Sequence, residues 1–183
     1  MNKQVADQLQ KTLRIPLEQI VREEYEMIVL KRLFESEIGS SFVFKGGTAL
    51  RLAYGCPRFS EDLDFSMIGD FDKESCDRVL RSIEHEYDTI TITECIQKQN
   101  TYFVRIQVKE SFLVQNFSIK FEASTRRIDG QWKRGDDFEL VVLNSRVTSL
   151  TVLAQVATLE RIEREMHKFL PESERKILES WLP

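Results

Sequence analysis

The stretch FVFKGGTALRLAYGCPRFSEDLDFSM, residues 42–67, decides the fold of this chain. It opens with a short apolar run that stops at two glycines, and good helix formers follow over residues 48–53. This order predicts a strand, a tight turn and a helix with the hydroxyl of Thr48 at its start. Because Gly46 and Gly47 lack Cβ atoms, the backbone of the turn can approach a ligand closely. Amide groups at a helix N-terminus favour an anion such as a triphosphate.

The same stretch ends in two aspartates, Asp62 and Asp64, that alternate with apolar residues. On a strand both carboxylates would lie on one face, where they repel each other unless a cation neutralises them. Mg²⁺ is the natural candidate, because it binds one or two carboxylates together with substrate phosphates. Taken alone, an Asp-x-Asp is more often a solvated edge and a Gly-Gly only a turn. Their order and context favour a nucleotide and metal site.

KGGTALRL and RFSEDLDFS together resemble the AbiEii/AbiGii toxin family, a bacterial branch of the nucleotidyltransferase superfamily. Arg51 and the segment 58–61, which includes Ser60, match the family as well as the glycines and aspartates do. The resemblance implies an α/β fold, a nucleotidyltransferase-like mixed sheet flanked by helices, with a short helical C-terminal extension. We expect the α/β core with its N-terminal helices to span residues 1–145 and the extension to span 146–183.

A later strand supplies the third metal-binding carboxylate in this family, and the resemblance places Glu122 there. Residues 117–123 alternate apolar and polar side chains, so Lys120 and Glu122 share a face. From the residues alone, such a pair is as often an exposed ion pair of little worth. The resemblance implies Asp62, Asp64 and Glu122 as catalytic and metal-binding residues that converge within metal-bridging reach. The nucleotide would be held by Lys45, Gly46, Gly47, Thr48, Arg51, Ser60 and Lys120.

The rest of the chain alternates helical and strand patterns without an internal repeat. Apolar residues at helical spacing predict a long helix over 17–34, and Asp72 can cap a second helix that reaches Tyr87. Two β-rich runs, 89–97 and 102–109, predict a hairpin.

The last third of the chain departs from the family pattern. A strand over 140–143 precedes a long helix that we expect from Leu150 to about Phe169, and Pro171 starts a short one. The resemblance implies a lysine on this helix and an arginine-aspartate-rich segment after it. Val156 stands at the position that we align with the lysine.

Composition fits one small domain of 183 residues, 42% of them hydrophobic. No apolar run approaches the roughly 20 residues that cross a bilayer, so we expect a cytoplasmic protein without membrane contact. Three cysteines without CxxC spacing indicate neither a disulfide framework nor a zinc site. A net charge of -4 argues against a surface that binds nucleic acid throughout, and leaves room for a local basic patch. Residues 126–134, four of them basic beside Trp132, form either such a contact or a solvated hairpin tip.

The function that the resemblance implies is transfer of a nucleoside monophosphate from an NTP, dependent on Mg²⁺ or Mn²⁺. The acceptor would be an RNA, such as tRNA, or a protein. The chain would act as the toxin of a toxin-antitoxin or phage-defence pair, with a cognate antitoxin encoded nearby. The alternative is a catalytically impaired nucleotide-binding module that acts through a partner, as the missing lysine suggests. A third reading is a structural remnant of a longer toxin.

Overall fold

The computed structural model describes residues 2–54, 56–68, 70–126, 137–142 and 145–151 of the chain. Contacts divide the chain into two units, Met1–Leu153 and Ala154–Pro183. The second unit lies outside the described residues, and so do Val156 and the expected helical extension from residue 152 onward.

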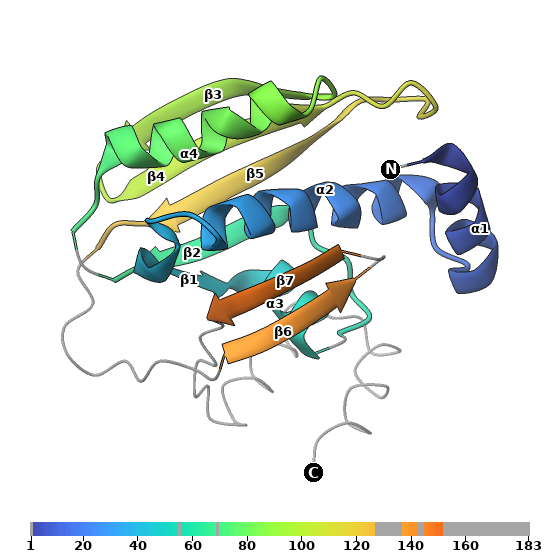
Figure 1. The fold of residues 1–183 in the computed structure, drawn as a ribbon, viewed down its shortest axis with the longest axis horizontal. Helices are drawn as coiled ribbons and strands as arrows, with labels where there is room; N and C mark the ends of the chain where they lie inside the picture. Colours follow the sequence, from blue (N-terminus) through green and yellow to red (C-terminus); the bar gives the residue numbers. More distant parts are fainter. Residues whose placement is uncertain (1, 55, 69, 127–136, 143–144, 152–183) are drawn as a thin grey trace, which may run out of the picture. The chain divides into compact units, whose positions relative to one another are not determined.

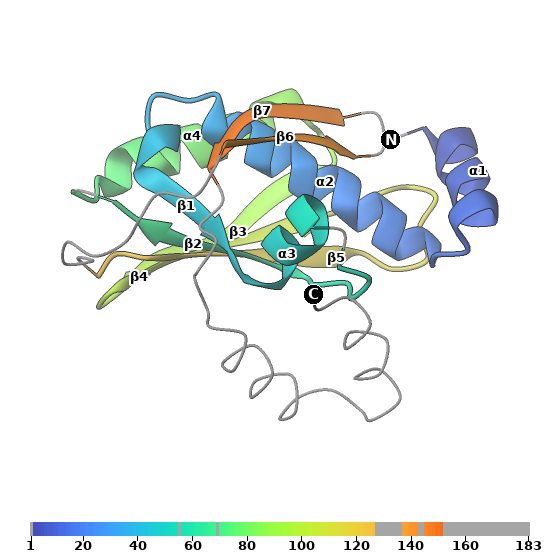
Figure 2. The ribbon, with the colours of Figure 1, turned by 90° about the horizontal axis from the view of Figure 1, so that it is seen from below.

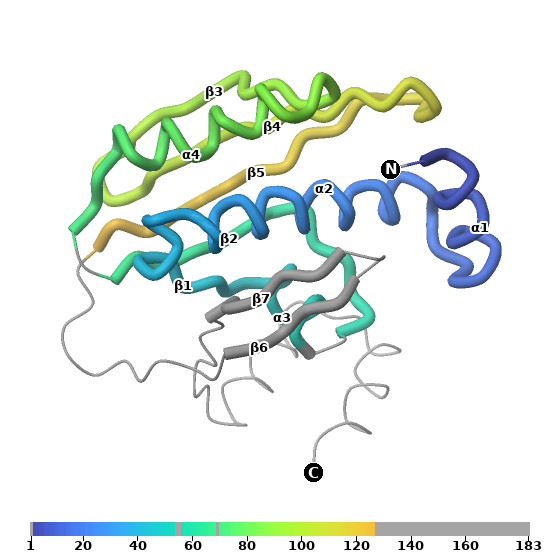
Figure 3. The backbone as a smooth tube through the Cα atoms, in the orientation of Figure 1, coloured from blue at the N-terminus to red at the C-terminus, as the bar shows by residue number. Residues whose placement is uncertain are grey.

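A five-stranded mixed sheet forms the centre of the first unit (Figure 1). Its strands, in order across the sheet, are β1 (Phe42–Lys45), β2 (Asp62–Met67), β5 (Phe117–Ser124), β4 (Thr101–Val108) and β3 (Ile90–Lys98). Strands β2 and β5 run parallel, whereas the other three neighbouring pairs are antiparallel. The parallel pair brings two segments that are far apart in the sequence side by side, as the backbone trace in Figure 3 shows.

Four α-helices are found among the described residues: α1 (Lys3–Leu13), α2 (Leu17–Phe34), α3 (Gly46–Tyr54) and α4 (Lys73–Glu86). A single 3-10 turn, η1 (Gly39–Ser41), connects α2 to β1. Helices α2 and α4 lie on the same face of the sheet (Figures 1 and 2), joined by a hydrogen bond from Arg32 Nε to Ser82 Oγ at 2.8 Å. The expected cap is confirmed, because the Asp72 side chain accepts a hydrogen bond from the backbone amide of Glu74.

The core lies between this helical layer and the sheet. Phe65 of β2 stacks on Phe121 of β5 with ring centroids 4.6 Å apart, and both are fully buried. Helices contribute the other side of the core, including Leu30 and Leu80. Burying each such side chain stabilises the fold by about 1.5–3 kcal/mol. The inward-facing residues expected on the second hairpin strand are buried too: Tyr102, Val104, Ile106 and Val108.

The remaining described strands form a separate two-stranded antiparallel sheet, β6 (Asp137–Val142) and β7 (Ser145–Thr151). The expectation that Leu150 begins a helix is therefore wrong, since Leu150 pairs with Phe138 across the two strands. Val147, Thr148 and Thr151 of β7 are β-branched, which suits a strand, and a nearby partner strand lets this preference prevail over the helical spacing. Strand β7 spans the position of the boundary expected at residues 145–146, and that boundary stays a prediction. In the described part of the chain, we find no helix with the length and apolarity needed to span a membrane.

Candidate active site

The face of the sheet opposite the core carries most of the residues expected in the site. Along β2 the side chains of Leu63 and Phe65 are buried, whereas Asp62 and Asp64 are half-buried and point to the other face. Strand β5 repeats the pattern, with Phe121 buried and its neighbours on the polar face.

The strand register places these polar residues side by side. Asp62 pairs with Lys120 and Asp64 with Glu122 across the parallel strands, while Lys45 pairs with Asp64 across the antiparallel β1–β2 edge. Neighbouring strands are about 4.8 Å apart, so Lys45, Asp64 and Glu122 form one row across the sheet. The prediction that Glu122 lies beside the aspartates, on the same face, agrees with this register.

The charges in this row act on one another. The pKa of Asp64 is raised by burial first, and then by the negative charges of Asp62 and Glu122, which the positive charges of Lys45 and Lys120 oppose. Lys120 Nζ lies 3.3 Å from Asp62 Oδ1, close enough for an ion pair. No hydrogen bond satisfies that buried oxygen.

Oxygen donors of this kind suit Mg²⁺ or Mn²⁺ chemically, because hard cations prefer carboxylates. Within the described ranges, however, no three His, Cys, Asp or Glu side chains are grouped closely enough to hold a metal ion. The expected convergence of the three carboxylates is therefore not met in this arrangement. Asp62 pairs with Lys120 instead, and this ion pair offsets part of the repulsion among the like charges. Asp62 Oδ1 accepts no hydrogen bond and has the Lys120 ammonium group as its ion-pair partner, so a bound cation could take the place of that ammonium group.

Side chains on the aspartate strand and just before it leave no room for a Cβ at either glycine. Gly46 adopts φ +83°, and a Cβ there would lie 2.4 Å from Asp64 Oδ2. A Cβ on Gly47 would lie 2.8 Å from Ser60 Oγ. We expected a ligand to approach these glycines closely. The side chains of Asp64 and Ser60 already do so in part.

Thr48 differs from its expected role as the hydroxyl at the helix start. Helix α3 already begins at Gly46, and Thr48 is buried within its first turn. Its hydroxyl donates to the carbonyl oxygen of Asp62 at 2.7 Å. This bond ties the start of α3 to the start of β2 and so positions the aspartates against the glycine turn.

Arg51 holds the segment that leads into β2. Its guanidinium pairs with Glu23, stacks 3.6 Å from the centroid of the Phe59 ring, and donates to the carbonyl oxygens of Cys56 and Pro57 at 3.2 and 3.3 Å. We expected Arg51 to contact the nucleotide, but these contacts describe a residue that positions the loop. Nothing in the sequence pattern links Arg51 to Glu23, because the pair forms between two helices.

Glu26 is a second residue that the sequence analysis missed. It is 1% exposed on α2, and its Oε1 has no hydrogen-bond partner. Burial raises its pKa well above the usual value, Glu23 and Asp62 raise it further, and Arg22 and Arg51 oppose the shift. The signal that would have revealed it is its helical spacing to Leu30 and Leu33, which puts a glutamate in line with buried apolar residues.

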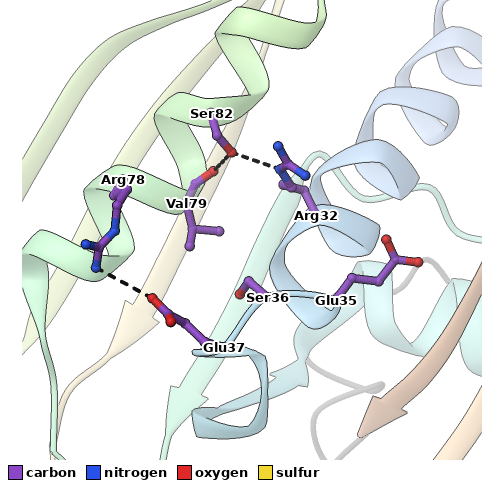
Figure 4. Close-up of a pocket in the computed structure, with 7 residues that line it drawn as sticks. All are labelled: Arg32, Glu35, Ser36, Glu37, Arg78, Val79 and Ser82. Carbon is purple, nitrogen blue, oxygen red and sulfur yellow. Dashed lines mark hydrogen bonds and ion pairs between the residues drawn. The ribbon is translucent and has the colours of Figure 1, made fainter.

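A surface pocket of about 280 Å³ lies elsewhere, between the C-terminal end of α2 and α4 (Figure 4). Both of its arginines are already engaged, Arg78 with Glu37 at 3.6 Å and Arg32 with Ser82 at 2.8 Å. Its volume is at the lower end of the range usual for small-molecule sites, and both of its arginines already bind side chains of the protein. It is lined by Arg32, Glu35, Ser36, Glu37, Arg78, Val79 and Ser82.

Comparison with known proteins identifies relatives of this arrangement. A family model described as "Nucleotidyl transferase AbiEii toxin, Type IV TA system" matches residues 28–162. No protein with a curated description matches the chain. Two solved structures share its fold. A proposed nucleotidyltransferase from H. pylori is 21% identical with a TM-score of 0.51, over 82% of this chain and 58% of its own.

The second is the nucleotidyltransferase toxin MenT4 from Mycobacterium tuberculosis H37Rv, 19% identical with a TM-score of 0.51, over 83% of this chain and 53% of its own. At these identities the likeness establishes the nucleotidyltransferase fold alone. The chain spans a little over half the length of the two structures.

Proposed function

Because the chain belongs to the AbiEii family of nucleotidyl transferase toxins, we propose that it transfers a nucleoside monophosphate from an NTP to an acceptor. The observation that carries the proposal is the row of carboxylates. Asp62, Asp64 and Glu122 lie on two adjacent parallel strands and on one sheet face, beside a glycine turn that opens a helix. A helix N-terminus of this kind favours phosphate groups, and the carboxylates lie next to it.

The roles of the nucleotide-binding residues follow from their places. The amides of Gly46 and Gly47 and the ammonium groups of Lys45 and Lys120 would contact the triphosphate, with Ser60 at the edge of the turn. Thr48 and Arg51 would act through the backbone that they hold, as their hydrogen bonds to strand β2 and its leading loop suggest.

Asp62, Asp64 and Glu122 would hold Mg²⁺ or Mn²⁺, which would supply positive charge where negative charge develops during transfer. Glu122 would also accept the proton of the attacking hydroxyl, a role supported by its position on β5 beside Asp64. Lys120 would leave Asp62 and turn to the phosphates when the nucleotide binds.

The acceptor and biological setting are the finer parts of the proposal. We propose an RNA such as tRNA as acceptor, with the chain acting inside the cell as the toxin of a type IV toxin-antitoxin or phage-defence pair. A separately encoded antitoxin would oppose it. Support for the toxin role comes from the family match over residues 28–162.

One labelling experiment tests the proposal. The purified chain is incubated with Mg²⁺, each α-labelled NTP in turn, and total cellular RNA, and the label is followed onto RNA or protein. We expect label on RNA, its loss in Asp64→Asn, and no loss in Asp88→Asn, a matched control at an exposed turn. Label on protein would mean that the acceptor is a protein and not RNA. Nucleotide binding without any transfer would contradict the enzyme function and favour the catalytically impaired nucleotide-binding module.

A further inference from the structure

The row of site residues continues beyond Glu122 into a pair of cations. Phe103 of β4 pairs with Glu122 of β5, on the same sheet face. Lys98 Nζ lies 5.6 Å and Arg105 Cζ 5.4 Å from the centroid of the Phe103 ring. Phe103 is only 9% exposed, so its ring is held in place and both cations pack against it. We call Lys98 and Arg105 the β3–β4 cation pair.

Both cations can reach a ligand. Lys98 is exposed, and the Arg105 side chain is 41% exposed. Arg105 forms an ion pair with Glu94 at 3.4 Å. Exposed pairs of this kind contribute about 0–1 kcal/mol, so a phosphate can replace Glu94 at little cost.

The position of the cation pair relative to the glycine turn indicates the side from which the acceptor would approach. Across the sheet the order is Lys45, Asp64, Glu122 and then Phe103, and the Gly46–Gly47 turn follows Lys45. In phosphoryl transfer the attacking oxygen and the leaving group lie in line on opposite sides of the phosphorus. If the leaving pyrophosphate lies at the glycine turn, the acceptor approaches from the side of β4, where the cation pair lies.

We propose that Lys98 and Arg105, held in place by Phe103, bind a backbone phosphate of a single-stranded RNA acceptor beside Glu122. The inference rests on the proposed function for the direction of approach and adds the acceptor subsite. Phe103 is one strand away from Glu122, about 4.8 Å, so a phosphate on the cation pair lies within one nucleotide of the attacking hydroxyl.

A third cation extends the basic surface toward the β3–β4 turn. The backbone amide of Thr125 donates to the carbonyl oxygen of Asn100 at 2.9 Å, which fixes the end of β5 next to this turn. Arg126 follows directly and is exposed. A chain with a net charge of -4 therefore has Lys98 and Arg105 together on this side of its carboxylates, with Arg126 following the end of β5 nearby in the sequence, which complements a polyanion.

RNA binding can be measured without any catalysis. A short fluorescent oligouridylate is titrated with the full chain, without NTP or Mg²⁺, and anisotropy is followed at several salt concentrations. For the double variant Lys98→Gln/Arg105→Gln we expect about tenfold weaker binding and a salt slope smaller by about 1 to 2. The matched control is Lys31→Gln/Arg81→Gln, which removes an exposed lysine and an arginine paired with Glu84 at 3.5 Å on the helical face. It should bind RNA within twofold of the unchanged chain.

If the double variant and the control lose RNA affinity equally, the binding is general electrostatic attraction and the proposal is wrong. The proposal is also wrong if neither variant loses RNA affinity. Phe103→Leu gives a second test that keeps an apolar side chain at this position. It should weaken RNA binding without changing NTP binding, and unchanged RNA binding would contradict the role of the ring.

The experiment separates this inference from the proposed function. Asp64→Asn should bind oligouridylate as well as the unchanged chain does, even if no transfer is ever detected. The converse result is also possible. If neither the cation-pair variant nor the unchanged chain binds RNA, but both transfer label to protein, the RNA subsite is wrong and the transferase function still holds.

Discussion

Glu26 shows how one residue can cost stability next to a functional site. It is buried on α2, and its carboxyl lies near the charges of Glu23, Arg51 and Asp62. The protonated form is favoured in the folded state, because ionisation would leave a buried charge in poor surroundings.

Replacing Glu26 should therefore change how stability depends on pH. Because its folded pKa is raised, the unfolded chain releases the proton first, and stability falls as the pH rises from the ordinary glutamate value toward the folded pKa. Glu26→Gln removes this loss. We expect urea unfolding to show a clear gain in the free energy of unfolding at pH 8 and little gain at pH 4. Glu35→Gln, at the exposed end of α2, should show neither effect; a gain in Glu26→Gln that is the same at both pH values would contradict the mechanism.

Replacing Lys120 should change the affinity for a metal ion and the affinity for a nucleotide in opposite directions. Its ammonium group neutralises Asp62, so it competes with a cation in the site while favouring phosphates. Lys120→Gln should bind Mn²⁺ alone several-fold more tightly, and Mg²⁺ with nucleotide more weakly. Manganese EPR and nucleotide calorimetry measure the two affinities, with Lys31→Gln as the control. A change of the same sign in both would place Lys120 outside the site.

At the scale of elements, the unit that matters is β1, the glycine turn, α3 and β2. Thr48 bonds to the backbone of Asp62, and Gly46 leaves room for Asp64, so the helix start and the aspartate strand fit each other directly. Arg51 secures the connection between them through Glu23 and Phe59. The site is positioned by these contacts before any ligand enters.

Gly46→Ala should damage both stability and the site. An alanine at φ +83° costs about 1–2 kcal/mol, and its Cβ would push Asp64 Oδ2 from its place. We expect a lower melting temperature and at least tenfold weaker binding of Mg²⁺ with nucleotide. Ala53→Gly in the same helix should cost up to about 1 kcal/mol while leaving nucleotide affinity intact. Equal losses of nucleotide affinity in the two variants would show that α3 matters only through its stability.

At the scale of the molecule, the core and the site use the same strands. Phe121 stacks on Phe65 in the core, while its neighbours Lys120 and Glu122 face the site. Strand β5 therefore carries both the central packing and the third carboxylate. Any shift of this strand moves the site as well.

Phe121→Leu should show this link. Loss of the ring contacts should lower the free energy of unfolding by about 1–3 kcal/mol, and the adjustment of β5 should weaken nucleotide binding. Val79→Ala on α4 should lower stability without changing nucleotide affinity, because Val79 lies away from β5 on the helical layer. Both quantities are measured by thermal unfolding with and without Mg²⁺ and nucleotide, and full nucleotide affinity in folded Phe121→Leu would refute the link.

Local patterns were sufficient for much of this protein. The glycine turn between an apolar run and a helix, the alternation around Asp62 and Asp64, and the helical spacing over residues 17–34 each depend on neighbours within a few positions. Strands β1, β2 and β5 and helices α2 and α4 were predicted for this reason. The motifs around the glycines and aspartates also indicated the AbiEii family, which the match over residues 28–162 confirms.

Contacts between distant segments could not be read from such patterns. The pairing of Arg51 with Glu23, the burial of Glu26 and the ion pair of Lys120 with Asp62 each join residues from different elements. Leu150 was assigned to a helix because its local spacing allowed one, whereas pairing with β6 made it part of a strand. Hydrophobic periodicity reports which face of an element is buried; which charges meet across elements depends on the strand order and register that packing of the whole chain produces.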